Sequence, residues 1–390
     1  MIFSELIDIN PAISMLKGTV YPFIEMANVD SYERAPKLID AKEYSSGVKF
    51  QDGDTVIARI TPCLQNGKGF YCKNIGCGFG STEFLVFRPK NDSVDNLFLY
   101  YYMQIDYVRQ SMIRSMIGAT GRQRVNNAVF DKLIVDFPDV ETQRLIASIL
   151  SAYDDLIENN RKQIKLLEEA AQRLYKEWFV DLRFPGWETA EIVDGVPVGW
   201  RRCNLSDVLL FNPKVSLSKD RVKQCVPMSA LSTTSMVIDF DDVTETVSNS
   251  GSKFQNGDTL LARITPCLEN GKTAFVAGLE SDEGAVGSTE FIVMRSKVLN
   301  SYMVYLLART DDFRKMAINS MTGSDGRQRA QVDKIQMYPY LLPNQSIIDE
   351  FEGIVKPIFD TIMNKNTASI KLKEARDRLL PKLMSGELEV

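Results

Sequence analysis

Apolar side chains recur at alternating steps of four and three residues between Thr142 and Leu182. A spacing that averages 3.5 residues over this length is typical of a coiled coil, not of a helix that lies on a globular core. The positions of this seam are Ile146, Leu150, Tyr153, Ile157, Asn160, Ile164, Leu167, Ala171, Leu174 and Trp178. A helix of about 40 residues would be roughly 60 Å long at 1.5 Å per residue. The pattern therefore predicts a spacer helix.

A second copy of this helix begins near Asn344 and runs to the C-terminus. The paired markers are Gln143 and Gln345, Ile146 and Ile348, Tyr153 and Phe359, Asn160 and Asn366, Ile164 and Ile370, and Leu174 and Leu379. The second copy holds four extra residues, which in a heptad pattern form a stutter that locally unwinds a supercoil. Because Pro357 lies beside the insertion, we expect the second helix to be kinked or split there.

The segments before each helix are also duplicated. KFQDGDTVIARITPCLQNGK (residues 49–68) matches residues 253–272, and GSTEFLVF (residues 80–87) matches residues 287–294. Gly-Asp turns lead into short buried strands, Asn-Gly pairs suggest hairpin turns, and one apolar helix is expected in each copy, over residues 97–112 and 302–316. This pattern predicts two similar α+β domains. The expected division is a first domain over 1–140, a central helix over 141–183, a connector with the second domain over 184–343, and a C-terminal helix over 344–390.

Composition narrows the possible chemistry. The chain has no histidine, which excludes serine-hydrolase triads and histidine-containing metal sites, so we expect no metal and no cofactor. The six cysteines are scattered without a CxxC pair, as expected for reduced thiols in a cytosolic protein. No apolar run approaches the roughly 18 residues of a membrane span, and the start of the chain does not read as a signal peptide. A net charge of −5 argues mildly against nucleic acid, so any DNA contact must come from local basic clusters or from partner subunits.

Motifs of known enzymes match poorly. Residues 270–273 (NGKT) resemble the end of a phosphate-binding loop, but Pro266 occupies the position of the first glycine, so a hairpin turn is favoured. The Asn-Pro pairs are followed by Ala12 and Lys214, and therefore do not form the Asn-Pro-Pro-aromatic motif of an amino-methyltransferase. Neither an S-adenosylmethionine fingerprint nor a nuclease set of carboxylates and lysine is visible. We therefore expect the chain itself to perform no chemistry.

Two glycine-rich loops, GRQR at residues 121–124 and at residues 326–329, are the best polar candidates. Arginine can bridge O6 and N7 of guanine, and glutamine can bridge N6 and N7 of adenine. The alternative is structural: an arginine that pairs with the helix base and a glutamine that caps the next strand. The turns at 66–68 and 270–272 could meet phosphates or bases, or could simply be solvated. The candidate DNA-contacting residues are Asn66, Lys68, Arg122, Gln123, Arg124, Asn270, Lys272, Arg327, Gln328 and Arg329.

Two further expectations concern packing. Arg59 and Arg263 alternate with buried strand residues and are expected to be structural partners of Glu83 and Glu290 rather than residues that contact a ligand. Asparagines at equivalent seam positions of the two helices could pair and fix the register, or could lie at frayed edges. The candidate helix-pairing residues are Asn160, Asn366, Ile157, Ile164, Leu167 and Leu174.

Three stretches resemble the DNA-specificity subunit of type I restriction–modification enzymes: residues 151–186, VPVGWRRCNLSDV at 196–208, and RDRLLPKLMSGELEV at 376–390. The resemblance implies two target-recognition domains separated by two long antiparallel coiled-coil helices, related by a pseudo-two-fold internal repeat. Each domain would read one half of a bipartite site in double-stranded DNA, and the helices would set the spacer between the halves. Two methyltransferase subunits and the restriction–translocase subunits would dock on the helices and connectors and supply the catalysis.

The resemblance also indicates where the two domains differ from each other. The first domain lacks a counterpart of the VPVGW entry that precedes the second. The two domains differ most over residues 21–48 with 70–79 and residues 222–252 with 273–286, which are therefore expected to select different half-sites. Two other classes stay open: a single-chain methyltransferase or nuclease with unrecognised motifs, and a coiled-coil scaffold without a DNA role.

Overall fold

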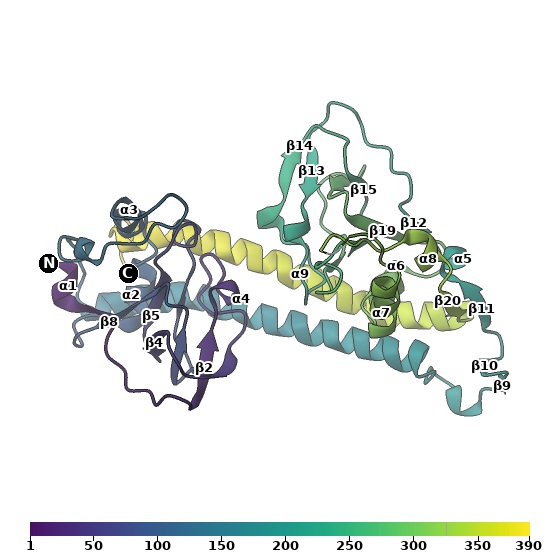
Figure 1. The fold of residues 1–390 in the computed structure, drawn as a ribbon, viewed down its shortest axis with the longest axis horizontal. Helices are drawn as coiled ribbons and strands as arrows, with labels where there is room; N and C mark the ends of the chain where they lie inside the picture. The colour runs from purple at the N-terminus through teal and green to yellow at the C-terminus, as the bar shows by residue number, and fades with distance from the viewer. Residues whose placement is uncertain (325) are drawn as a thin grey trace. The chain divides into compact units, whose positions relative to one another are not determined.

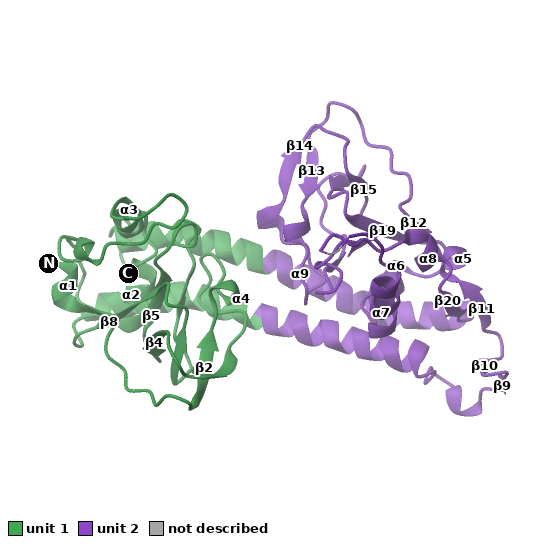
Figure 2. Ribbon diagram, viewed as in Figure 1, with its two compact units in different colours: residues 1–159, 369–390 green, residues 160–368 purple. Residues whose placement is uncertain are grey.

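The computed structural model describes residues 1–324 and 326–390, and these form two compact units (Figure 2). Unit 1 comprises residues 1–159 with 369–390, and unit 2 comprises residues 160–368. Each unit contains one sheet-rich globe and a part of each of two long helices, α4 and α9, labelled in Figure 1. The expected α+β fold with an internal repeat is confirmed, whereas the division of the sequence into four segments stays a prediction.

Unit 1 is built on two four-stranded sheets. The first has the order β1 (Ile7–Ile9), β8 (Phe84–Pro89), β5 (Thr55–Ala58) and β6 (Gly69–Tyr71). The second has the order β3 (Asp40–Glu43), β2 (Val20–Ile24), β7 (Cys77–Gly80) and β4 (Val48–Gln51). All four residues of β5 are buried, as is typical of a central strand covered on both faces. The only parallel pair among these strands is β2 with β7.

Unit 2 repeats this topology strand for strand. Its first sheet has the order β12 (Leu209–Phe211), β19 (Phe291–Ser296), β16 (Thr259–Ala262) and β17 (Thr273–Phe275). Its second sheet has the order β14 (Thr244–Thr246), β13 (Lys223–Val226), β18 (Ala285–Gly287) and β15 (Ser252–Phe254). The duplication in the sequence is therefore a duplication of the fold, down to the single parallel pair, β13 with β18.

Apart from single 3-10 turns, the remaining α-helices and strands are short. In unit 1 they are α1 (Phe3–Leu6), α2 (Asn96–Tyr102) and α3 (Asp106–Arg114). In unit 2 they are β9 (Ile192–Val193), β10 (Val196–Pro197), β11 (Arg201–Asn204), α5 (Leu205–Val208), α6 (Ser301–Ala308), α7 (Asp311–Asn319), α8 (Val332–Gln336) and β20 (Pro339–Leu342). Among the described residues no helix has both the length and the apolar character that a membrane span needs.

The Gly-Asp turns carry a buried carboxylate that fixes the start of each central strand. Asp54 is fully buried, accepts a hydrogen bond from the Gln51 backbone N–H at 2.8 Å, and accepts two more from Arg88 at 2.6 and 2.8 Å. Asp258 repeats the arrangement with its own partners in unit 2. Such charge-assisted bidentate pairs are among the stronger hydrogen bonds in proteins, so each turn is held firmly against its sheet.

Two local predictions are wrong. The apolar segment expected as one helix in each unit is two helices, α2 with α3 and α6 with α7. In unit 2 the break is set by Thr310, whose hydroxyl accepts a hydrogen bond from the Phe313 backbone N–H and so begins a new helix. The Asn-Gly pairs do not form two-residue hairpin turns either. Strands β5 and β6 do form a hairpin, but residues 59–68 connect them through successive hydrogen-bonded turns.

The central helix α4 (Val140–Tyr175) follows the predicted seam and continues as one π-helical segment over Lys176–Val180. Every seam position is buried or half-buried, including Asn160, while the residues between them are mostly exposed. A stripe of this kind requires a partner helix along its length, and α9 supplies it within each unit.

The C-terminal helix α9 (Gln345–Met384) is continuous, so the prediction that Pro357 splits it is wrong. A proline inside a helix removes one hydrogen bond and normally costs about 3 kcal/mol. Here the neighbouring turns are anchored in the core of unit 2, where Val355, Phe359 and Ile362 are at most 1 % exposed. Burial of these apolar side chains offsets the lost bond and holds the helix through the proline.

Within unit 1 the two helices pack antiparallel. Ile146 and Leu150 of α4 share a core with Leu380 and Leu383 of α9. Further along α4, Asp154 pairs with Arg376, which lies earlier in α9. The pairing partners thus run in opposite sequence directions.

Within unit 2 the same holds for the other ends of the helices. Ile164 and Ala171 of α4 share a core with Phe359 and Ile362 of α9. Near the end of α4, the ring of Tyr175 lies 6.1 Å from the ring of Phe351.

Candidate nucleic-acid interface

The GRQR loop of unit 1 lies against the segment that follows β5. The Arg124 backbone bridges both Ile60 and Ile117, and the Thr61 backbone N–H donates to the Gln123 carbonyl at 3.0 Å. Gly118 has a φ of 124°, which favours glycine, and a Cβ there would lie 3.2 Å from the Arg122 carbonyl oxygen. The loop is thus a folded structure that presents its side chains in a defined way.

Unit 2 repeats this geometry. Arg329 bridges Ile264 and Thr322, and the Thr265 backbone N–H donates to the Gln328 carbonyl at 3.0 Å. The glutamines of both loops are therefore held by their main chains, and no hydrogen bond from their side-chain amides to a strand is found among the described residues. Gln331, two residues beyond Arg329, instead donates its side-chain amide to the Arg329 carbonyl.

The last arginine of each loop forms an ion pair with a glutamate. Arg124 Nε and Nη2 donate to the two carboxylate oxygens of Glu83 at 2.8 and 2.5 Å, and Arg329 meets Glu290 at 3.0 and 2.6 Å. The hydrogen bonds from Arg124 hold the pKa of Glu83 below its usual range, although partial burial of the carboxylate works in the opposite direction. Arg329 lowers the pKa of Glu290 in the same way. Both arginines thus have a structural role at the surface.

The expectation that Arg59 and Arg263 are structural partners of Glu83 and Glu290 is confirmed at the main chain, where their backbone N–H groups donate to the glutamate carbonyls at 2.8 and 2.9 Å. Their guanidinium groups form no ion pair with these carboxylates among the described residues. Arg59 Nη2 donates to the Val125 carbonyl at 3.1 Å, and Arg263 Nη2 donates to the Ala330 carbonyl at 3.3 Å. These bonds fasten the chain that follows each loop. In both arginines the Nε atom is buried without a hydrogen-bond partner among the described residues.

The first arginine of each loop has a different environment. Arg122 and Arg327 are exposed, and neither takes part in an ion pair among the described residues. Within the part of the chain that the structure describes, these are the loop arginines that are not held by a glutamate. Contact of DNA with these two arginines, with the loop glutamines or with the arginines paired to glutamate stays a prediction.

The Asn-Gly-Lys turns contribute less than the sequence suggested. Asn66 and Asn270 are exposed, but Lys68 donates its ammonium group to the Met26 carbonyl at 3.1 Å, and Lys272 donates to the Met228 carbonyl at 2.8 Å. Each lysine therefore ties its turn to a neighbouring loop of the same unit. The asparagines stay candidates for DNA contact, whereas a lysine would have to give up its carbonyl partner to meet a phosphate.

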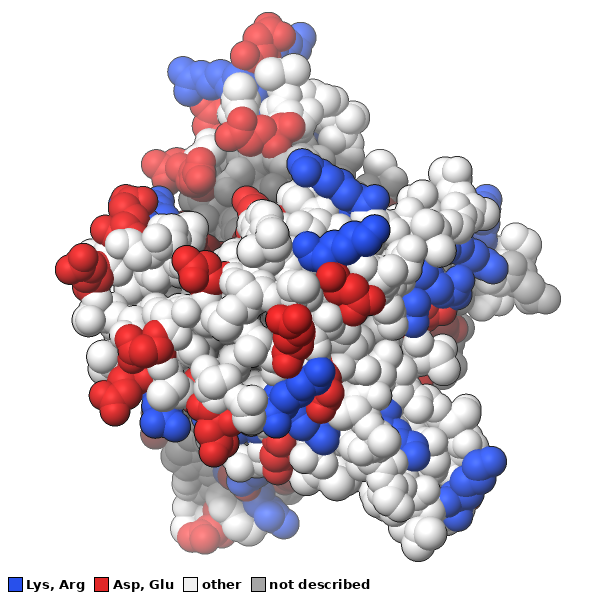
Figure 3. All heavy atoms as spheres, turned by 90° about the vertical axis from the view of Figure 1, so that its left-hand side faces the viewer, with Lys and Arg blue, Asp and Glu red and all other residues white. Residues whose placement is uncertain are grey.

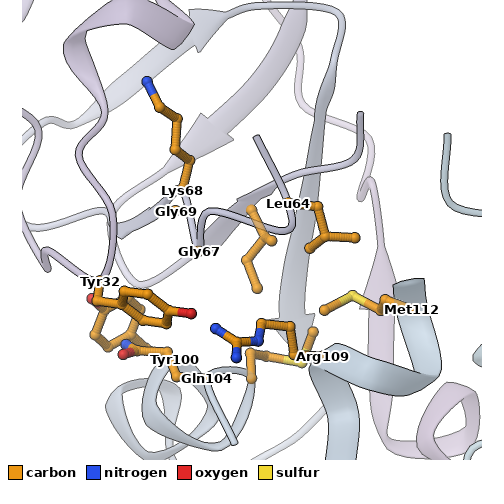
Figure 4. Close-up of a pocket in the computed structure, with 11 residues that line it drawn as sticks. Tyr32, Leu64, Gly67, Lys68, Gly69, Tyr100, Gln104, Arg109 and Met112 are labelled. Atoms are coloured by element: carbon orange, nitrogen blue, oxygen red, sulfur yellow. The ribbon is translucent and has the colours of Figure 1, made fainter. Parts of the chain in front are cut away.

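A small cavity of about 30 Å³ lies beside the turn in unit 1 (Figure 4). The guanidinium carbon of Arg109 lies 5.0 Å from the ring centroid of Tyr32, and that ring covers Gly67. Arg109 Nε and Nη1 and Gln104 Nε2 are buried without hydrogen-bond partners in the described chain. Lys68 points away from the cavity in Figure 4. A volume of this size holds about one water molecule, so it is too small for a base and suits a solvent molecule bound to these donors.

The candidate helix-pairing residues lie as the seam predicts, but their role in pairing stays a prediction. Ile157 and Ile164 are buried, and Leu167 and Leu174 pack at the edge of the unit 2 core. Asn160 and Asn366 are both half-buried.

Sequence reasoning missed the residues that fasten the globes to the helices. In unit 1 the buried Arg34 donates to Asp155 at 2.5 Å and to Glu158 at 2.8 Å on α4. In unit 2 Glu168 of α4 accepts hydrogen bonds from the Met236 backbone N–H at 2.7 Å and from the Ser235 hydroxyl at 2.8 Å. Burial raises the pKa of Glu168, although both hydrogen bonds act in the opposite direction.

No sequence signal marked these anchors. They lie within the divergent segments or on the polar side of the seam, and a lone charged residue there reads as solvated.

Charges of both signs are interspersed over the face that Figure 3 shows, and no continuous basic patch covers that face. This agrees with the even balance of 46 Lys and Arg against 51 Asp and Glu. On this face, binding to a polyanion would therefore depend on particular basic side chains and not on a broad positive field.

Comparison with known proteins gives a consistent result. The family model described as "Type I restriction modification DNA specificity domain" matches residues 11–169. The MjaIX specificity subunit of a type I restriction enzyme from Methanocaldococcus jannaschii is 28 % identical over 322 residues, which cover 77 % of this chain and 71 % of that protein. The HindI specificity subunit from Haemophilus influenzae is 22 % identical over 401 residues, covering 86 % of each chain.

The fold agrees as well. The crystal structure of a type I restriction–modification S subunit from M. genitalium superimposes with a TM-score of 0.54 at 12 % identity, covering 98 % of this chain and 95 % of that one. At this identity the likeness concerns the fold alone, and it extends over both units and both long helices. With the repeated globes, the paired helices and the matches along the sequence, this chain is similar over most of its length to type I restriction–modification specificity subunits.

Proposed function

We propose that this chain is the non-catalytic DNA-recognition subunit of a type I restriction–modification enzyme. In this proposal each globe reads one half of a bipartite sequence in double-stranded DNA, and α4 with α9 sets the spacer between the halves. Methyl transfer and cleavage belong to other subunits, namely two methyltransferase subunits and the restriction–translocase subunits.

The proposal rests on one observation: the two globes share the same fold and turn contacts but differ in the segments that form their edge strands. The two globes share strand order, the buried Gly-Asp turn and the paired arginine of the GRQR loop. They differ over the segments that build β2 and β3 in unit 1 and β13 and β14 in unit 2. Two globes with a common fold and different edge segments suit a DNA site with two different half-sequences. Contacts to bases specify sequence, whereas contacts to phosphates position the duplex and can be the same in both globes.

The division of labour follows from the side chains present. Among the described residues no group of three or more cysteine, aspartate or glutamate side chains could hold a metal ion. The buried carboxylates are used structurally: Asp54 and Asp258 bind arginines, and Asp154 binds Arg376 and the Tyr101 hydroxyl. We therefore assign DNA recognition to this chain and the groups that carry out methyl transfer and cleavage to its partner subunits.

The test is equilibrium binding to duplexes that carry the sequence methylated in cells. The full chain co-purified with its methyltransferase subunits is expected to bind that sequence far more tightly than the chain alone, with a steep dependence on salt. Equal and salt-insensitive binding to any duplex would contradict the proposal.

Titration of the isolated chain with S-adenosylmethionine in a calorimeter is the control for the competing function. The account expects no heat of binding. Saturable binding would instead favour a single-chain methyltransferase.

A further inference from the structure

A basic groove in unit 2 differs from the matching region of unit 1. The groove, with a volume of about 640 Å³, lies between the chain that follows β12, the start of β15 and the strand β19. Its polar lining includes Lys214, Lys219, Asn249, Lys253, Arg263 and Thr289. None of the lining residues is acidic, so the groove has a local positive charge in a chain whose net charge is −5.

Lys253 is the central feature of this groove. It is half-buried at the start of β15, and no hydrogen bond or ion pair engages its ammonium group among the described residues. The strand register makes Lys49 its counterpart in unit 1, since Lys49 pairs with Phe79 as Lys253 pairs with Val286. Lys49 donates to the Ile13 carbonyl at 2.7 Å and lies 5.1 Å from the ring centroid of Tyr44. The same lysine thus has partners in unit 1, whereas the described residues of unit 2 offer it none.

The physical cause is the size of the neighbouring side chains. In unit 1 three aromatic rings, those of Phe23, Tyr44 and Phe79, form a cluster with centroid separations of 4.9 and 5.1 Å. The register equivalents of Phe23 and Phe79 in unit 2 are Cys225 and Val286. Counting on along the chain from the paired residues of β3 and β14 places Ser248 at the position of Tyr44. Because these residues are small, they provide no ring to cover the lysine.

Other charged groups near the groove are already paired. Lys223 donates to the Asn249 side-chain oxygen at 2.6 Å, and the Asn249 amide donates to the Leu217 carbonyl. The Glu283 carboxylate accepts hydrogen bonds from the Ser218 backbone N–H and hydroxyl at 2.9 and 2.8 Å. Its pKa is held below the usual range mainly by these two hydrogen bonds, so it remains charged and occupied at neutral pH.

We propose that this groove binds the sugar–phosphate backbone of the DNA half-site read by unit 2, with the Lys253 ammonium donating to a phosphate oxygen and Lys214 and Lys219 flanking it. This inference rests on the proposed function. A half-buried lysine whose ammonium group has no partner among the described residues gains most from an anion, and a duplex supplies phosphates at regular spacing. Phosphate contacts position a protein on DNA without reading its sequence, so the groove supports recognition by residues elsewhere in the unit.

The test is the salt dependence of specific binding by the chain assembled with its methyltransferase subunits. Fluorescence anisotropy with a duplex carrying the methylated sequence would be measured between about 0.05 and 0.3 M NaCl. Lys253→Gln removes one phosphate contact, so the slope of log K against log salt should become shallower by about 0.9, and affinity near 0.1 M salt should fall about eightfold. Lys253→Arg should keep the slope. The sequence preference, measured with a mismatched duplex, should not change.

Lys49→Gln is the matched control. Because Lys49 is bound to a carbonyl and stacked on an aromatic ring, its loss should leave the slope unchanged. An unchanged slope for Lys253→Gln beside a steep wild-type slope overturns the inference and leaves the proposed function intact. An equal loss in both variants also overturns it. A wild-type assembly that binds every duplex equally and without salt dependence instead overturns the proposed function.

Discussion

The buried contact between Asp154 and Arg376 gives the sharpest prediction about stability. Both side chains are 2 % exposed, and Arg376 Nη1 lies 2.5 Å from the Asp154 carboxylate. The other carboxylate oxygen accepts the Tyr101 hydroxyl at 2.5 Å, and Arg376 also donates to the Tyr32 carbonyl. This network joins α4, α9 and the globe of unit 1 through one carboxylate. We therefore expect Asp154→Ala to weaken unit 1 strongly.

The size of the stability loss depends on the groups that Asp154→Ala leaves without partners. Removing one partner of a buried ion pair costs about 3–5 kcal/mol, because the remaining charge stays buried. Asp377 retains a contact with Arg376 at 2.7 Å, but Asp377 is 47 % exposed, so it compensates weakly. The Tyr101 hydroxyl also loses its acceptor, which adds about 1–3 kcal/mol. We expect a net loss of at least about 4 kcal/mol, which is a large fraction of the stability of an ordinary domain.

The assay is urea unfolding followed by two probes. Far-UV circular dichroism reports both units, whereas all three tryptophans (Trp178, Trp187 and Trp200) lie in unit 2. For a slope of about 2 kcal/mol per molar urea, a loss of 4 kcal/mol lowers the midpoint by about 2 M. The part of the dichroism transition that reports unit 1 should move by this amount, and the tryptophan transition, which reports unit 2, should move less.

Asp360→Ala is the control, since its pair with Lys356 on α9 is about half exposed on both sides. An exposed pair of this kind contributes about 0–1 kcal/mol. Replacing Asp154 and Arg376 together by leucine should cost less than Asp154→Ala, because no charge then remains buried. If Asp154→Ala lowered the stability no more than Asp360→Ala, this network would not be what holds α4, α9 and the globe of unit 1 together.

Two further predictions concern the loop and the helices. The lowered pKa of Glu83 means that its contribution to stability is complete above the ordinary carboxyl pKa of about 4.3 and is lost as the pH falls through the lower folded-state pKa. Arg124→Met should therefore be less stable than wild type at pH 6 and converge with it in strong acid, and a gap that does not change with pH in urea titrations would contradict this. Inserting four residues after Ile164, with a matching insertion in α9, adds about 6 Å, or roughly two base-pair steps. Methylation mapping should show a longer spacer with unchanged half-sites, and altered half-sites would refute the role of the helices in spacing.

The sequence predicts the parts of the fold that depend on periodicity. The 3.5-residue seam locates α4, and the structure buries this apolar stripe against both α9 and residues of the globes. The duplicated strands predict the duplicated sheets, because equal patterns of buried positions fold in equal registers. Pro357 shows the limit of local rules: tertiary packing on both sides of it keeps α9 continuous.

The candidate site is predicted less well because it depends on contacts between distant residues. Strand alternation placed Arg59 near Glu83, but the returning loop brings Arg124 to the same carboxylate with better geometry. Lys253 and Lys49 lie in matching sequence motifs, and only the neighbouring strands decide which of them is covered. Residues contributed by the divergent segments therefore could not be assigned from the repeated motifs alone.

The central claim is that each globe reads its own half of the DNA site. The most direct measurement is methylation-site sequencing in cells that carry this chain with its partner subunits, before and after residues 21–48 and 70–79 are replaced by those of a relative with a different specificity. These segments form much of the variable edge of unit 1. The account predicts that one half-site changes while the other half-site and the spacer stay the same. A site that is unchanged, or one in which both halves change together, would contradict it.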